Sequence, residues 1–234
     1  MTRLRTLAGG TWRADAYPGA TGAGVRVAVI DSGADEAAMR GPSRSGVSFD
    51  AAGARADDAH DRHGHGSSVV ATIRAAAPDV EILPVKVFDL ELRATVDALV
   101  AAIDFAAGAG VHLINLSLGT TNVAHRLRLG EALVRAARAG AAVVAADVDE
   151  SGTTWLPGSL PLAIGVSTDR TVPPGTAVVT ASHEGAVRVL RARAAGAPAV
   201  TRPAGGEPDP GGVSFAVATV TGLLALQLSA EVPE

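Results

Sequence analysis

The sequence predicts an α/β protein with three layers, in which a mostly parallel central sheet carries helices on both faces. Short β-branched runs alternate with alanine-rich stretches of helical spacing, an order typical of βαβ units. The β-branched runs are mostly apolar, as expected for strands buried on both faces. The chain has 234 residues, 47% hydrophobic and 19% charged, which is enough for one large domain with a sizeable core.

Buried strands are expected at five places along the chain. They are 25–30 (VRVAVI), 81–88 (EILPVKVF), 111–118 (VHLINLSL), 141–147 (AAVVAAD) and 162–167 (LAIGVS). Helices are expected between them at about 66–76, 92–109 and 124–139. In the second of these helices the apolar residues recur at helical spacing, and Gly108 and Gly110 suit its end. The alternation of the two periods supports the predicted fold class.

Two regions, 41–62 and 168–212, lack a helical pattern. The second contains VVTASHEGAVRVLRA, which could form a short antiparallel pair, and RPAGGEPDPGG, which is typical of a loop. No shift in composition marks a second domain. We therefore expect one domain over 1–234, with an N-terminal extension at 1–20 and a flexible loop at 201–212.

Composition excludes several classes of protein. The chain has no cysteine, so disulfides, thiolate catalysis and cysteine-based zinc sites are ruled out. A net charge of −4 offers no electrostatic reason to expect nucleic acid. The first 19 residues lack the apolar segment of a secretion signal. The longest apolar stretch, VSFAVATVTGLLALQL, looks too short and interrupted to cross a membrane, so a buried helix and a cytoplasmic protein are expected.

Polar residues at the ends of predicted elements are candidates for chemistry. Asp31 ends the strand in VAVIDSG, at the edge of the sheet where α/β proteins form their sites. An aspartate there could also cap a helix or bind a metal ion. His65, in DRHGHGSSVVATI, lies where a glycine turn enters a helix. It could act as a general base, pair with His63 on a metal ion, or be structural.

Ser214 is the third candidate, in the stretch GGVSFAVATVTG. It stands near the start of a long apolar helix, where a serine is most often an N-cap. The N–H groups of the first turn and the helix dipole could also stabilise an oxyanion beside this hydroxyl.

The order Asp31, His65, Ser214 is the order found in subtilisin, and with its surrounding motifs the chain resembles the subtilisin-like (subtilase) serine proteases. VAVIDSGAD is similar to their Asp box, DRHGHGSSVVATI to D-x-x-G-H-G-T-H-V-A-G-T, and GGVSFAVATVTG to G-T-S-x-A-x-P-x-V-x-G. LPVKVF and LINLSLG match strands that flank the substrate cleft of the family, and WLPGSLPLAIGV resembles a later segment. The resemblance covers about 22–228.

The resemblance implies a serine endopeptidase that cleaves through an acyl-enzyme. Ser214 would attack the peptide carbonyl, His65 would carry the proton, and Asp31 would hold the imidazole. Asp61 falls on the aspartate of the family's His box and is expected to cap the helix or orient the loop. No cofactor and no metal ion are expected.

The resemblance also implies a substrate site and partners. The chain edge at Ser117, Leu118 and Gly119 would pair with an extended substrate. The expected partner is a peptide or protein substrate and could include a partner chain, with no nucleic acid and no membrane.

One departure concerns the oxyanion hole. The family supplies a second donor from an Asn in a stretch like A-A-G-N, whereas this chain has VVAADVDESG. Asp147 and Asp149 are the candidates for that place. An ionised carboxylate would repel the oxyanion, and a protonated one could donate only with a raised pKa. Loss of such a donor costs about 10²–10³ in turnover.

Several functions stay open from the sequence. A selective intracellular protease, for example one that trims a leader from a precursor peptide, is the first. Asp147, Asp149 and Glu150 suggest basic or polar substrate side chains. The alternatives are a catalytically weak or inactive protein that binds peptides or a partner, and a transpeptidase or macrocyclase that uses the same acyl-enzyme.

Overall fold

The structure is a computed structural model that describes residues 9–88, 92–185, 187–196 and 212–230. The five predicted strands are present, within a few residues of the expected bounds, as β2 (Arg26–Asp31), β5 (Glu81–Lys86), β6 (Leu113–Leu116), β7 (Ala142–Ala146) and β8 (Ala163–Thr168). The helices are α1 (His65–Ala76), α2 (Val96–Gly108), α3 (Arg126–Ala139) and α4 (Val213–Ala230).

All described strands join one sheet in the order β1-β9-β10-β8-β7-β6-β2-β5-β3-β4. The seven strands from β10 to β3 in that order run parallel, while β9, β1 and β4 pair antiparallel at the edges. The additional strands are β1 (Gly10–Arg13), β3 (Val47–Phe49), β4 (Arg55–Ala56), β9 (Thr176–Glu184) and β10 (Val187–Ala194). This is the mostly parallel sheet that the sequence predicts.

The sheet includes strands near its edges that the sequence did not predict. The antiparallel pair expected in VVTASHEGAVRVLRA is confirmed as β9 and β10. Residues 10–13 form β1 and pair with β9, so this part of the predicted N-terminal extension belongs to the sheet. Trp12 anchors it, because its side chain is buried in the core. The predicted loop at 201–212 lies outside the described residues except for Gly212.

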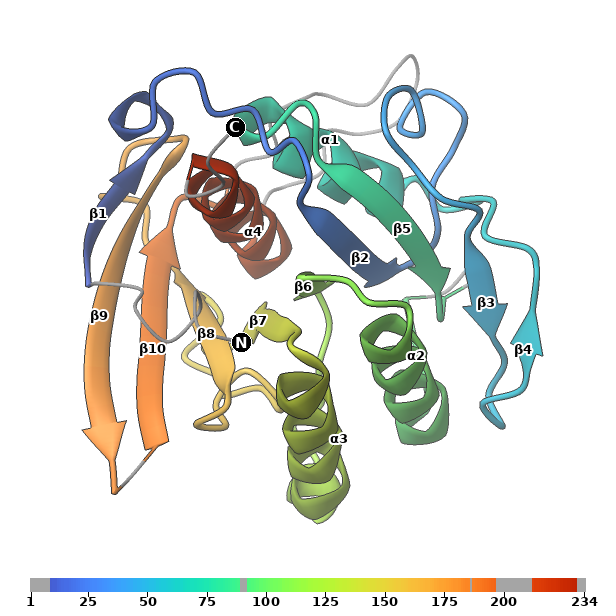
Figure 1. The fold of residues 1–234 in the computed structure, drawn as a ribbon. Helices are drawn as coiled ribbons and strands as arrows, with labels where there is room; N and C mark the ends of the chain where they lie inside the picture. Colours follow the sequence, from blue (N-terminus) through green and yellow to red (C-terminus); the bar gives the residue numbers. More distant parts are fainter. Residues whose placement is uncertain (1–8, 89–91, 186, 197–211, 231–234) are drawn as a thin grey trace.

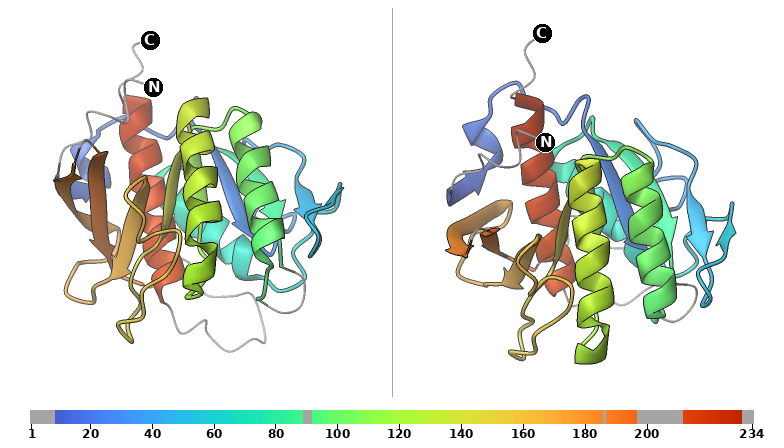
Figure 2. Two further views of the ribbon diagram at one scale, coloured as in Figure 1. Left: turned by 90° about the horizontal axis from the view of Figure 1, so that it is seen from below. Right: turned by 60° about the horizontal axis from the view of Figure 1, so that its bottom comes forward.

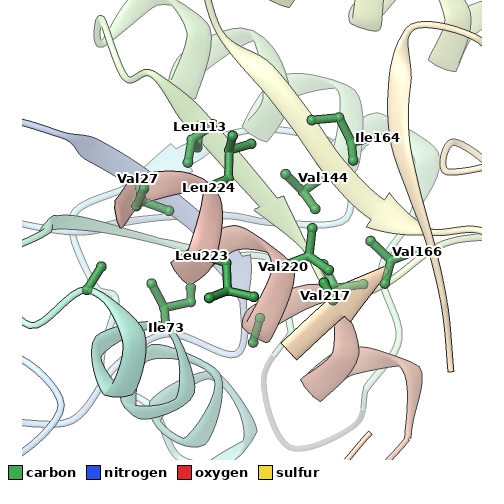
Figure 3. Close-up of a cluster of buried hydrophobic side chains, with 14 of the residues drawn as sticks. Val27, Ile73, Leu113, Val144, Ile164, Val166, Val217, Val220, Leu223 and Leu224 are labelled. Carbon is green, nitrogen blue, oxygen red and sulfur yellow. The ribbon is translucent and has the colours of Figure 1, made fainter. Parts of the chain in front are cut away.

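Helices cover both faces of the sheet, which gives three layers (Figures 1 and 2). Helices α1 and α4 pack on one face and on each other, and α2 and α3 pack on the other face. Each face therefore has its own apolar core, and the sheet between them is buried on both sides. In Figure 3, Val217, Val220 and Leu223 of α4 lie among side chains of the sheet and of α1.

Helix α4 is the most deeply buried helix of the first face. Its 18 residues have a mean hydropathy of 1.7, so by length and composition alone it could cross a membrane. The expectation that this apolar stretch is too short to do so was therefore wrong. In the fold, however, 72% of the helix is buried against other elements. Its apolar surface is therefore used to hold the sheet and α1 together.

Candidate active site

The candidate site forms where the parallel strands end, since their carboxyl ends meet at one edge of the sheet. Asp31 is the last residue of β2 and is fully buried, and its Oδ1 accepts a hydrogen bond from the N–H of Ser32 at 2.7 Å. His65 is the first residue of α1 and is 8% exposed. Its Nδ1 lies 2.7 Å from Oδ1 of Asp31. Two predicted site residues, 34 positions apart in the sequence, are thus in direct contact.

Glycines allow this contact because the two loops pass very close to each other. A Cβ added at Gly66 would lie 2.2 Å from the carbonyl oxygen of Gly33, and Gly33 itself has a φ of +104°. Gly64 caps α1 in the left-handed region, with a φ of 88°. Side chains at these positions would push the His65 loop away from the Asp31 loop.

Asp61 ties the same two loops together. Its carboxylate is 7% exposed and accepts hydrogen bonds from the hydroxyl groups of Ser32 and Ser67 and from the backbone N–H of Gly64. Burial favours a higher pKa for Asp61, but these hydrogen bonds outweigh it and lower the pKa below its ordinary value. The structure therefore supports the expected role of Asp61 in orienting the loop.

Ser214 lies in the first turn of α4, next to the end of β6. Its hydroxyl donates to the carbonyl oxygen of Ser117 at 3.2 Å, and the hydroxyl of Ser117 lies 3.2 Å from the carbonyl oxygen of Ser214. Deeper in the core, Asn115 Nδ2 donates to Thr221 Oγ1 at 2.9 Å. These polar contacts fix the N-terminal end of α4 against β6.

One pocket of about 450 Å³ contains both His65 and Ser214 in its wall. The three predicted substrate-binding residues, Ser117, Leu118 and Gly119, line the same pocket. The ring of Phe215, which follows Ser214, lies 5.8 Å from the ring of His65 between centroids. The structure thus places the imidazole, the serine and the predicted substrate edge around one cavity.

Most of the other residues in the pocket wall were not predicted from the sequence. These residues are Phe88, Leu92, Arg93, Ala94, Thr95, Val96, Leu99, Thr120, His125 and Trp155. They come from the end of β5, from α2 and its approach, and from loops after β6 and β7. The signal available in the sequence was weak: Trp155 is one of two tryptophans in a chain with few aromatic residues.

The two aspartates expected in the oxyanion hole have other partners. Asp147 Oδ2 lies 3.1 Å from Nε of Arg191, and burial raises the pKa of Asp147 while Arg191 opposes the rise. Asp149 accepts from the hydroxyl of Ser151 at 2.6 Å and from Trp155 Nε1 at 2.9 Å. Hydrogen bonds, chiefly from Ser151 and Trp155, lower the pKa of Asp149 to about 2. Neither aspartate lines the pocket.

These contacts speak against the expected donor role of Asp149, and Asp147 is paired with Arg191 outside the pocket wall. An aspartate with a pKa of about 2 is ionised at neutral pH and can only accept hydrogen bonds. Glu150 is also engaged elsewhere, in an ion pair with Arg170. The acidic side chains that suggested basic substrates therefore do not face the pocket, and that expectation loses its support.

The arrangement of the histidines does not suit a shared metal ion. The rings of His63 and His65 are 6.4 Å apart between centroids, and Nδ1 of His65 is engaged by Asp31. Within the described part of the chain, no three His, Asp or Glu side chains are grouped as ligands of one ion. The imidazole of His65 instead contacts the carboxylate of Asp31 and shares the wall of one pocket with Ser214.

Comparisons with known proteins relate the chain to subtilisin-like proteins. Alkaline elastase YaB from Bacillus sp. (strain YaB) is 32% identical over 160 residues, which are 62% of this chain and 40% of the elastase. Subtilisin BL from Lederbergia lenta is 33% identical over 140 residues, 55% of this chain and 49% of that protein. The matched segment thus spans less than half the length of either relative.

A solved structure and a family model cover more of the chain. The crystal structure of a cold adapted subtilisin-like serine proteinase matches 91% of this chain and 78% of its own, with a TM-score of 0.69 and 21% identity, which shows a shared fold. The model of the Subtilase family matches residues 22–233. Because this match covers nearly the whole sequence, the chain belongs to the subtilase family.

Proposed function

We propose that the protein is a serine endopeptidase that cleaves peptide bonds with Asp31, His65 and Ser214. The observation that carries the proposal is the 2.7 Å contact between His65 and buried Asp31, beside a pocket whose wall also holds Ser214. Membership of the subtilase family supports the same reaction.

The contact between His65 and Asp31, and the pocket wall that His65 shares with Ser214, support the following roles. Nδ1 of His65 is engaged by Asp31, so Nε2 is the nitrogen that exchanges a proton with the hydroxyl of Ser214. Asp31 holds the imidazole in this tautomer and stabilises its protonated form. Ser214 then attacks the peptide carbonyl, and His65 returns the proton to the leaving amine.

The oxyanion would have one hydrogen-bond donor where the family has two. The N–H of Ser214 belongs to the first turn of α4, where N–H groups have no acceptor within the helix, and it supplies one donor. Asp149, on the stretch that matches the family's Asn, supplies none while ionised. We therefore expect turnover lower by about 10²–10³ than with two full donors.

A slow enzyme with a pocket of about 450 Å³ suits selective cleavage better than bulk digestion. The finer proposal is therefore a processing protease, for example one that trims a leader from a precursor peptide. Digestion of a whole proteome should yield few new N-termini, and these should share residues near the cut, since one pocket would select them. Cleavage spread over unrelated sites would contradict the selectivity.

Peptide hydrolysis in H₂¹⁸O tests the reaction itself. The wild type should release fragments that carry one ¹⁸O at the new carboxyl group, and Ser214→Ala and His65→Ala should release none at comparable protein concentration. Joined or cyclic products without ¹⁸O would instead indicate transpeptidation through the same acyl-enzyme.

A peptide-binding protein without turnover is the second candidate, and the ionised Asp149 is the observation that favours it. It predicts that the wild type and Ser214→Ala bind peptides equally well and that neither forms fragments. Measurable wild-type hydrolysis that Ser214→Ala abolishes would exclude it.

A further inference from the structure

We propose that Asp61 is a positioning residue for the Asp31–His65 pair, in that its buried carboxylate fixes the loop that carries the imidazole and its charge favours the imidazolium. The inference rests on the proposed function, because it assigns Asp61 a part in the same proton transfer. Asp61 does not line the pocket, so it acts through its neighbours and touches no substrate there.

The carboxylate of Asp61 is saturated with hydrogen bonds. Its Oδ1 accepts from Ser32 Oγ at 2.9 Å, from the N–H of His63 at 2.9 Å and from the N–H of Gly64 at 2.6 Å. Its Oδ2 accepts from the N–H of Ser67 at 2.9 Å and from the hydroxyl of Ser67 at 2.6 Å. All five donors point at one side chain, and only an ionised carboxylate can accept from them all.

The donors stand directly beside the reacting pair. Ser32 follows Asp31 in the chain, and Gly64 precedes His65. The N–H of Gly66, on the other side of His65, donates to Ser32 Oγ at 2.9 Å. The same serine hydroxyl thus links the backbone after His65 to the carboxylate. Loosening this network would change the distance between the imidazole and the buried carboxylate that orients it.

The carboxylate of Asp61 is charged at neutral pH. The hydrogen bonds to Asp61 outweigh its burial and keep its pKa low, so it is ionised at neutral pH. Other ionisable groups around His65 are Asp31 in direct contact and His63, with rings 6.4 Å apart. Arg93 and His125 line the same pocket as His65. Lys86, which is paired with Asp31 across the sheet, donates to the carbonyl of His60. Asp61 therefore places a second negative charge on the loop that carries His65, where it is bonded to the N–H groups of His63 and Gly64.

Asp61→Asn keeps the shape of the side chain but removes its charge and one of its acceptor oxygens. The matched control is Asp58→Asn, which makes the same chemical change on the same loop. Asp58 is exposed and accepts from the N–H of His60 and from Arg62, both at 3.0 Å. The two variants differ only in whether the carboxylate holds the loop around His65.

Steady-state kinetics should separate the two variants. In Asp61→Asn we expect kcat to fall on the order of tenfold to a hundredfold, because a displaced imidazole lowers the rate of proton transfer. The acid limb of the kcat/KM profile should shift to lower pH by about half a unit to one unit, because loss of a nearby negative charge disfavours the imidazolium. KM should stay within about twofold. Asp58→Asn should match the wild type in every respect.

An NMR titration of His65 in the Ser214→Ala background supplies a readout that needs no turnover. Adding Asp61→Asn should lower the pKa of His65, and adding Asp58→Asn should leave it unchanged. If the wild type hydrolyses nothing but the pKa of His65 falls as expected, the proposed function fails while the coupling stands. If hydrolysis is normal and neither kcat nor the pKa of His65 moves, the inference is overturned alone.

A second variant guards against misfolding of Asp61→Asn. Ser67→Ala removes one hydroxyl donor to Asp61, together with the acceptor of the Asp35 N–H, and leaves the charge in place. It should lower kcat several-fold without moving the acid limb, since orientation is disturbed and charge is not. An unchanged kcat in a folded Ser67→Ala would contradict the positioning role.

Discussion

At the scale of single residues, the hydrogen-bond partners of each carboxylate decide what it can do. Asp31 is fully buried and faces the imidazole of His65. Asp149, also an aspartate, lies in a turn where its carboxylate accepts hydrogen bonds from Ser151 and Thr153 of its own loop and from Trp155. Sequence position predicts the first role from a strand end, whereas the second depends on a loop conformation that no local pattern reveals.

Replacing Asp149 by Asn tests whether the family's amide would restore an oxyanion donor. Asp149 holds Trp155, a wall of the pocket, by a 2.9 Å hydrogen bond from Nε1. The side-chain NH₂ of Asn is itself a donor and cannot accept from the N–H and O–H groups that Asp149 binds, so the loop would loosen. We expect kcat unchanged within about twofold and KM raised, with altered tryptophan fluorescence. A rise in kcat of tenfold or more would show that this side chain reaches the oxyanion.

The low pKa of Asp149 also predicts how stability depends on pH. Its pKa is about 2 in the folded protein and about 3.9 in the unfolded chain. A carboxyl group with a lowered folded pKa stabilises the fold above its unfolded pKa, and that contribution disappears as the pH falls from about 4 to about 2. Chemical denaturation across this window should show a flatter pH dependence for Asp149→Asn. Identical slopes for variant and wild type would contradict the assignment.

At the scale of elements, the site depends on how closely two loops approach at the carboxyl end of the sheet. Gly66 and Gly33 come so near that a Cβ at Gly66 would meet the Gly33 carbonyl oxygen at 2.2 Å. The sequence places glycines on both sides of His65, and the structure explains them by this contact. A tight turn alone would not require Gly66, which lies inside α1.

Gly66→Ala should therefore damage both stability and the active site. The backbone must move to relieve the contact, which displaces His65 from Asp31. We expect a loss of about 1–3 kcal/mol in the free energy of unfolding and a fall in hydrolysis of a hundredfold or more. Gly108→Ala is the control, since nothing lies within 4 Å of its added Cβ and alanine favours a helix. Wild-type activity in Gly66→Ala would refute the close approach.

Secondary structure was predictable where burial leaves a pattern in the sequence. The strands β2, β5, β6, β7 and β8 are apolar runs because the sheet is covered on both faces. The short strands β1, β3 and β4 were missed because two to four residues are too few to show a period in the sequence. Trp155 was missed because long-range contacts place it at the pocket.

At the scale of the whole molecule, α4 joins the core to the site. The helix places Ser214 at the pocket by its first turn, while its later turns pack against the sheet and α1 (Figure 3). Its high hydropathy reflects this burial. The position of Ser214 thus depends on the packing of α4.

Truncation within α4 should destabilise the entire fold. Leu223 is fully buried between the layers, so Leu223→Ala removes apolar contacts and leaves a cavity. The expected loss is about 2–5 kcal/mol in the free energy of unfolding, measured by urea denaturation. Leu127 of α3 is 72% exposed, and Leu127→Ala should change stability by less than about 0.5 kcal/mol. Equal effects of the two truncations would contradict this packing.

The central claim is that Asp31, His65 and Ser214 act as one proton-transfer unit although they lie far apart in the sequence. A fluorophosphonate probe that reacts only with an activated serine tests it most directly, with the modified residue mapped by mass spectrometry. The account predicts a single adduct on Ser214, with labelling reduced at least a hundredfold in His65→Ala and in Asp31→Asn. An adduct on another residue, or labelling of Ser214 that persists undiminished without the imidazole, would contradict it.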